Sequence, residues 1–148
     1  MKGQFCTFEV DGLLLGVEVG QVQEVMRLQR VTEVPLSPEV VGGLIHQRGQ
    51  ILTAIDLRRR LGLPARAGKA AAMNVVVRTK SGTVSLMVDE IGDVIEMDED
   101  HFEPVPDTLQ GEARELVKGA FKLEDRLLIV LDAERASLTE REDENGKN

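Results

Sequence analysis

The amino-acid sequence predicts an all-β protein with a few short helices, and three observations lead to that fold class. Short β-type runs are separated by glycine-containing turns along the chain. Two of the resulting run-turn-run units have the spacing of β-hairpins. The order of landmarks in the first half of the chain recurs in the second half, which indicates two copies of one small β unit.

The two hairpins are predicted from the residues at their reversals. Asp11-Gly12 joins the runs at residues 5–10 and 13–19, and Ser81-Gly82 joins those at 74–79 and 83–88. Glycine suits these positions because it adopts positive φ without a Cβ clash, and Asp or Ser tolerates the turn position before it. The residues therefore predict strands and turns in both segments and leave the turn type open.

The internal repeat extends well beyond the hairpins. Its matched pairs are Gly12 with Gly82, Val22 and Val25 with Ile91 and Val94, Val34-Pro35 with Val105-Pro106, Gly43 with Gly119, and the apolar run 51–56 with 127–132. The offset between partners drifts along the chain, as insertions in surface loops would produce. Each copy is expected to span roughly 60 residues.

Short helices are expected after the last strand of each copy. Asp56 is suited to cap a helix in which Leu57 and Leu61 share one face, and this helix would tie the two halves together. A matching segment follows at residues 132–136. Residues 65–72 are expected to form a linker of small residues, and residues 137–148 an acidic, disordered tail.

Composition excludes several classes of function. The net charge is −8, with +2 over residues 1–72 and −10 over residues 73–148, which argues against nucleic-acid binding. No apolar run approaches the roughly 20 residues that span a bilayer. The single cysteine, Cys6, cannot form an internal disulfide, and no leader follows the first residues, so a cytoplasmic protein is expected.

No catalytic or cofactor-binding motif is present. His46 and His101 lie in no metal-ligand spacing, and one cysteine cannot build a thiolate zinc site. The glycine-rich stretch 42–49 lacks both the Lys-Ser/Thr ending of a P-loop and the GxGxxG order. The sequence therefore predicts a binding protein without metal, cofactor or enzymatic activity.

Two short segments are the best candidates for a functional role. In the segment 22–25, Glu24 is an acid among apolar residues. The segment Gln47-Arg48-Gly49 lies between two strand-like runs and places an arginine at a turn. An arginine among apolar strands is expected to pair with a carboxylate, for which Glu24 and Asp56 are both candidates. Such a pair would serve as a structural clamp, as part of a partner-binding surface, or as both.

The ordered motifs resemble those of one protein family. They are Phe8 with Asp11-Gly12, Val22-Gln23-Glu24-Val25, Val34-Pro35 with Gly43, Arg48-Gly49, Ile55-Asp56-Leu57-Arg58, Val88-Asp89 with Val94, and Pro104-Val105-Pro106. This series is similar to the chemotaxis coupling (adaptor) protein family CheW. The likeness covers residues 5–136, as a single CheW-like domain.

The resemblance implies a fold and a function. The fold is two SH3-like, five-stranded β-barrels around a shared core, the first mainly at residues 13–65 and the second mainly at 73–131, with strand exchange near the termini. The implied function is non-catalytic: the adaptor couples methyl-accepting chemoreceptors, at their cytoplasmic tip, to the regulatory domain of the histidine kinase CheA. Such a protein is cytoplasmic and is recruited to membrane-associated receptor arrays.

The resemblance also assigns candidate residues. Val22, Glu24, Gly43, Arg48 and Val94 fall on family positions tied to receptor binding or signal coupling, and Glu24 and Arg48 on positions that form an ion pair. The kinase contact falls mainly on the second barrel, with no individual residues assigned.

One departure and two alternatives qualify the resemblance. His46-Gln47 stands where the family commonly has Asn-Leu, so a specialised receptor array in a gliding, pilus or developmental chemosensory pathway is an alternative to a flagellar one. A kinase regulatory domain expressed alone is an alternative, and an enzyme or ligand carrier would need a deep pocket with converging polar groups.

Overall fold

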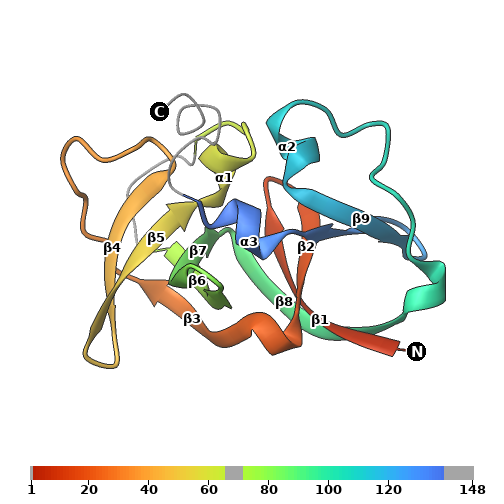
Figure 1. The fold of residues 1–148 in the computed structure, drawn as a ribbon, viewed down its shortest axis with the longest axis horizontal. Helices are drawn as coiled ribbons and strands as arrows, with labels where there is room; N and C mark the ends of the chain where they lie inside the picture. Colours follow the sequence, from red (N-terminus) through yellow and green to blue (C-terminus); the bar gives the residue numbers. More distant parts are fainter. Residues whose placement is uncertain (1, 66–71, 139–148) are drawn as a thin grey trace.

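The computed structural model describes residues 2–65 and 72–138 and consists mainly of strands (Figure 1). The strands are β1 (Lys2–Val10), β2 (Leu13–Glu18), β3 (Val22–Gln29), β4 (Val41–Gln47), β5 (Gln50–Asp56), β6 (Ala72–Thr79), β7 (Gly82–Val88), β8 (Glu90–Asp98), β9 (Val117–Lys122) and β10 (Leu127–Leu131). The short helices are η1 (Val19–Gln21), α1 (Leu57–Arg60), η2 (Glu99–His101), α2 (Glu112–Glu115) and α3 (Ala133–Ala136). Most of the expected linker and nearly all of the expected tail lie outside the described residues.

The strands form two five-stranded sheets with the same topology, which confirms the predicted fold class. Sheet A has the order β8-β1-β2-β10-β9, and sheet B has the order β3-β6-β7-β5-β4. Each sheet contains one parallel pairing, β10 with β2 and β5 with β7, among antiparallel ones. Each strand of sheet A has a counterpart at the same place in sheet B. The pairs are β8 with β3, β1 with β6, β2 with β7, β10 with β5 and β9 with β4.

The two sheets do not divide the chain at a single point. Sheet B is built from the continuous stretch 22–88, and sheet A combines residues 2–18 with residues 90–131. The hairpins of the two copies are therefore exchanged: β1 and β2 join the later strands, and β6 and β7 join the earlier ones. Both hairpins have the same apolar pattern, so the sequence repeat could not indicate which set of strands each would join.

One glycine in each barrel allows that barrel to close. In sheet B, Thr32 and Leu44 exchange backbone hydrogen bonds of 2.8 and 2.7 Å, and a Cβ on Gly43 would lie within 3.0 Å of the Thr32 carbonyl. In sheet A, Glu103 and Ala120 make the equivalent bridge, and a Cβ on Gly119 would clash with the Glu103 carbonyl. The matched glycines of the repeat thus occupy equivalent places.

A shared core joins the two sheets, which lie side by side in Figure 1. One apolar cluster takes buried residues from both, including Phe8 and Leu15 of sheet A and Val75 and Leu86 of sheet B. Each barrel also has a smaller cluster of its own, Phe5, Leu14, Phe121, Leu128 and Val130 in sheet A and Met26, Ile45, Leu52, Ala54 and Val76 in sheet B. Successive residues of the hairpins alternate between the two kinds of core, because neighbouring side chains of a strand point to opposite faces.

Two of the short helices connect the barrels. Asp56 caps α1 as predicted, since its Oδ1 accepts hydrogen bonds from the backbone N–H groups of Arg58 and Arg59. Asp132 caps α3 in the same way. The buried side chains Leu57 and Ala133 place both helices in the shared core.

Candidate functional site

The candidate site lies at the tip of the hairpin formed by β4 and β5. Gln47 and Gln50 are the last cross-strand pair, and Arg48-Gly49 forms the two-residue turn between them. Arg48 has φ +52° and Gly49 has φ +80°, the positive values that a tight hairpin turn requires at both positions. Positive φ is unfavourable for arginine. The hairpin therefore imposes an uncommon backbone conformation that fixes where the Arg48 side chain begins.

Three side chains meet at this tip. The Glu24 Oε1 atom, from β3, accepts hydrogen bonds from Arg48 Nε at 3.0 Å and from Gln47 Nε2 at 2.5 Å. The Arg48 side chain is 76% exposed and that of Glu24 is 30% exposed, whereas Gln47 is only 4% exposed. The Arg48 hydrogen bond, supported by that from Gln47, lowers the pKa of Glu24 against the opposing effect of desolvation. Glu24 is consequently ionised at neutral pH.

The structure distinguishes the two carboxylates that the sequence left open as partners of Arg48. Asp56 caps α1, and its Oδ2 lies 3.5 Å from Arg59 Nε. Arg48 instead lies against Glu24.

The other candidate residues lie around this pair or in the other sheet. Val22 is on β3 and packs partly against the shared core. Gly43 is on β4, at the barrel closure. Val94 is on β8 of sheet A, where its side chain is 57% exposed. Glu24 and Arg48 are therefore in contact, whereas Val94 belongs to a separate sheet.

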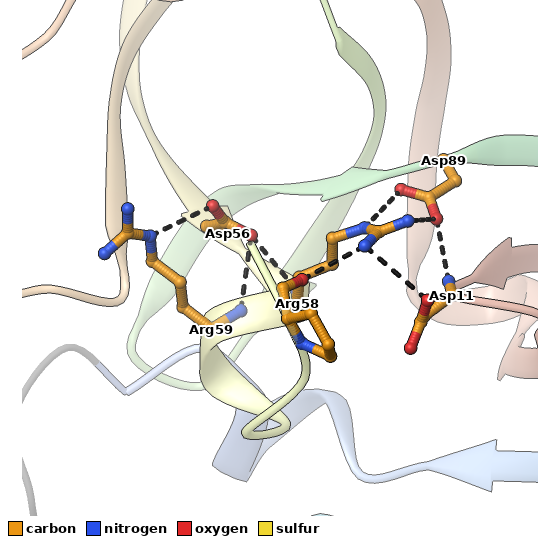
Figure 2. A network of polar contacts seen from close by, with 6 residues as sticks. Asp11, Asp56, Arg58, Arg59 and Asp89 are labelled. Atoms are coloured by element: carbon orange, nitrogen blue, oxygen red, sulfur yellow. Dashed lines mark hydrogen bonds and ion pairs between the residues drawn. The ribbon is translucent and has the colours of Figure 1, made fainter. Parts of the chain in front are cut away.

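A second polar cluster was not predicted from the sequence, and it links the two sheets (Figure 2). Arg58, from α1, contacts Asp89 through two hydrogen bonds of 2.7 and 3.1 Å, and its Nη1 lies 3.6 Å from Asp11 in the β1–β2 turn. Asp89 also accepts a 2.7 Å hydrogen bond from the Asp11 backbone N–H. The Arg58 and Asp89 side chains are 19% and 21% exposed. Asp89 raises the pKa of Arg58, which keeps the guanidinium charged.

Within the described residues, 2–65 and 72–138, no group of three or more His, Cys, Asp or Glu side chains is arranged to hold a metal ion. No helix in the same part of the chain is long and apolar enough to cross a membrane.

Comparison with known proteins identifies the family. Residues 4–140 match the CheW-like domain. The chain is 32% identical over 126 residues to Chemotaxis protein CheW of Bacillus subtilis (strain 168), an alignment that covers 85% of this chain and 81% of the relative. The chain belongs to the CheW-like family.

Other comparisons agree with this assignment. Chemotaxis protein CheW of Thermotoga maritima is 29% identical over 129 residues, 87% of this chain and 83% of the relative. The crystal structure of the scaffolding protein TtCheW from Thermoanaerobacter tengcongensis has a TM-score of 0.83 at 27% identity and covers 96% of this chain and 97% of its own. This CheW-like chain is therefore a non-catalytic adaptor of chemotaxis signalling with the two-barrel fold that the resemblance implied.

Gln47 lies in a segment that the sequence singled out, but the contribution of its side chain to the site was not predicted. Its position departs from the family pattern, but its burial and its hydrogen bond to Glu24 emerge only when β3 and β4 are brought together.

Proposed function

We propose that this CheW-like protein couples methyl-accepting chemoreceptors, at their cytoplasmic tip, to the regulatory domain of the histidine kinase CheA. The observation that carries the proposal is the family match over nearly the whole chain, together with relatives named for chemotaxis and a structural neighbour described as a scaffolding protein. Two barrels joined through a shared core provide separate surfaces on one molecule, which is what a bridge between two partners requires. The protein would act in the cytoplasm, recruited to membrane-associated receptor arrays.

Val22, Glu24, Gly43, Arg48 and Val94 are proposed to serve receptor binding or signal coupling. The exposure of Arg48 and Val94 supports direct contact with a partner. Val22 packs on the shared core and Gly43 permits barrel closure, so these two would act by holding the surface in shape. The exposed Glu24–Arg48 ion pair is a weak source of stability, which favours a binding role over a purely structural clamp.

The kinase contact is proposed to lie mainly on the barrel of sheet A. Signalling contacts of this kind often bury no more than about 1,600 Å². Their weak individual affinities would be raised in an array, where each adaptor is held at high effective concentration near its partners.

The proposal is tested by titrating the protein against a receptor cytoplasmic tip and against a CheA regulatory domain. Arg48→Ala should weaken receptor binding while circular dichroism shows a folded protein. Arg126→Ala is the matched control: Arg126 follows β9, near the equivalent hairpin tip of sheet A, and its Nη1 lies 3.2 Å from Glu9. The control should leave receptor binding unchanged. Failure of the wild type to bind either partner would refute the coupling function.

A second candidate is coupling in a non-flagellar chemosensory pathway. It is supported by His46-Gln47 at the hairpin tip, where the family commonly has Asn-Leu. Titration against receptor tips from both kinds of pathway would decide between the candidates, since the cognate tip should bind more tightly.

A further inference from the structure

Arg48 uses only part of its hydrogen-bonding capacity within the protein. Its Nε donates to Glu24, while its two terminal Nη groups have no hydrogen-bond partner among the residues that the structure describes. The Nη groups carry four N–H donors that can engage a carboxylate. The guanidinium is thus hydrogen-bonded to Glu24 through Nε, whereas its two Nη groups are exposed to solvent.

Other arginines of the described chain differ in this respect. Arg58 has its fork engaged by Asp89, and Arg126 uses one Nη on Glu9 and the other on the Gly12 carbonyl. Arg27, on β3, is exposed, but no hydrogen bond within the described residues orients it. The guanidinium of Arg48 is both oriented by a hydrogen bond and accessible to a partner.

Gln47 contacts the Glu24 carboxylate from the buried side of the hairpin. It is almost fully buried, its Nε2 donates to the same Glu24 oxygen that Arg48 contacts, and its Oε1 is buried without a partner in the described part of the chain. A buried amide with an unsatisfied oxygen costs stability relative to an apolar side chain. The hydrogen bond from Gln47 to Glu24 does not involve Arg48 and would persist if Arg48 turned toward another anion.

We propose that the tip of the β4–β5 hairpin is a carboxylate-recognition site, in which Arg48 binds an Asp or Glu side chain of the receptor tip while Gln47 holds Glu24 in place behind it. This inference rests on the proposed receptor-binding function and adds the chemistry of the contact. Arg48 is the contact residue, and Gln47 is a positioning residue that acts through Glu24.

The geometry of the Arg48 guanidinium restricts the partner surface further. Bidentate contact with the arginine fork would set the register of that surface, which a point charge would not do.

The first experiment titrates the full chain with a receptor cytoplasmic tip. Arg48→Lys keeps the charge but loses the planar fork, and is expected to weaken binding by about tenfold; Arg27→Gln, which removes an exposed arginine without an orienting partner, should bind like the wild type. Arg48→Glu should be rescued by a receptor tip in which one carboxylate is replaced by arginine. If Arg48→Lys binds as tightly as the wild type, or if none of the single carboxylate replacements restores binding to Arg48→Glu, the proposal is wrong.

A second measurement isolates Gln47. NMR titration of the free protein should place the Glu24 carboxyl pKa below its ordinary value of 4.5 in the wild type. The pKa should be higher in Gln47→Leu, which removes one of the hydrogen bonds that lower it. On β6, the strand paired with β3, the residues opposite this part of β3 are Val76 and Val77, so no further charge faces Glu24 from that strand. An unchanged Glu24 pKa in a folded Gln47→Leu variant would contradict the positioning role.

The two hypotheses fail in different ways. A wild type that does not bind the receptor tip refutes the proposed function itself. A wild type that binds, together with Arg48 variants that bind equally well, refutes the carboxylate site alone.

Discussion

Replacing Gly43 by alanine tests how the barrel of sheet B closes. The added Cβ would lie within 3.0 Å of the Thr32 carbonyl oxygen, a separation that real Cβ atoms essentially never show. Gly43 also has φ +148°, a conformation that residues with side chains rarely adopt. The methyl group must therefore push the Thr32 segment away from β4 or force the backbone of Gly43 to change.

The magnitude follows from the contacts at risk. The two hydrogen bonds between Thr32 and Leu44 contribute about 1–3 kcal/mol together, and the backbone strain adds about 1–3 kcal/mol. We expect a loss of about 2–6 kcal/mol in the free energy of unfolding, which for a chain of this size lowers Tm by about 4–24 °C. Gly119→Ala should have a similar effect, because its Cβ would clash with the Glu103 carbonyl in the other barrel.

The assay is thermal and urea denaturation followed by circular dichroism, with Gly20→Ala as the control. A Cβ on Gly20 would meet nothing within 4 Å, and Gly20 has no positive φ, so alanine should change the free energy of unfolding by no more than about 0.5 kcal/mol. A Tm for Gly43→Ala that is indistinguishable from that of Gly20→Ala would refute the closure argument. Normal receptor binding by the folded Gly43→Ala protein would place the role of Gly43 in stability rather than in contact.

Three further predictions concern the core and the ion pairs. Asp89→Ala should lower the free energy of unfolding by about 2–4 kcal/mol in urea denaturation, because it leaves the largely buried Arg58 without its main partner; a change below about 0.5 kcal/mol would show that Arg58 finds another acceptor. Leu57→Ala should cost about 2–5 kcal/mol, since the side chain is fully buried in the shared core, and a smaller loss would mean that the helices repack around the cavity. Arg48 lowers the pKa of Glu24 in the folded protein, so the pair stabilises the fold above the ordinary carboxyl pKa of 4.5 and loses this effect as the pH falls through the folded value. The urea midpoints of wild type and Glu24→Gln should therefore differ at pH 7 and converge as the pH falls below the folded-state pKa of Glu24, whereas a constant difference would exclude the ion pair as its source.

Local features of the fold were predictable from the sequence, because turns and caps depend on neighbouring residues. Asp11-Gly12 forms the observed reversal between β1 and β2, and Asp56 caps α1. The second reversal is one residue away from the predicted position: Lys80-Ser81 forms the turn, and Gly82, paired with Thr79, is the first residue of β7. Gly43 and Gly119 were matched by the repeat alone, although only the structure shows the carbonyl groups that exclude a side chain there.

Contacts between distant segments could not be predicted in the same way. Asp11, Arg58 and Asp89 meet only because the β1–β2 turn, α1 and the end of β7 converge where the two sheets join. Gln47 is polar and would be expected at the surface, and Gln50 opposite it is indeed exposed. Gln47 and Gln50 differ because β3 brings the Glu24 carboxylate to Gln47.

The exchanged hairpins have a consequence for the order in which the protein folds during synthesis. Sheet B comes from one continuous stretch and can form as soon as residues 22–88 have left the ribosome. Strand β2 must wait for β10, since Leu14 pairs with Leu128 near the opposite end of the chain. At typical elongation rates that wait is on the order of ten seconds. The first hairpin to be made is thus the last to be enclosed on both sides, and its apolar edge is the segment most in need of protection from aggregation while the ribosome finishes the chain.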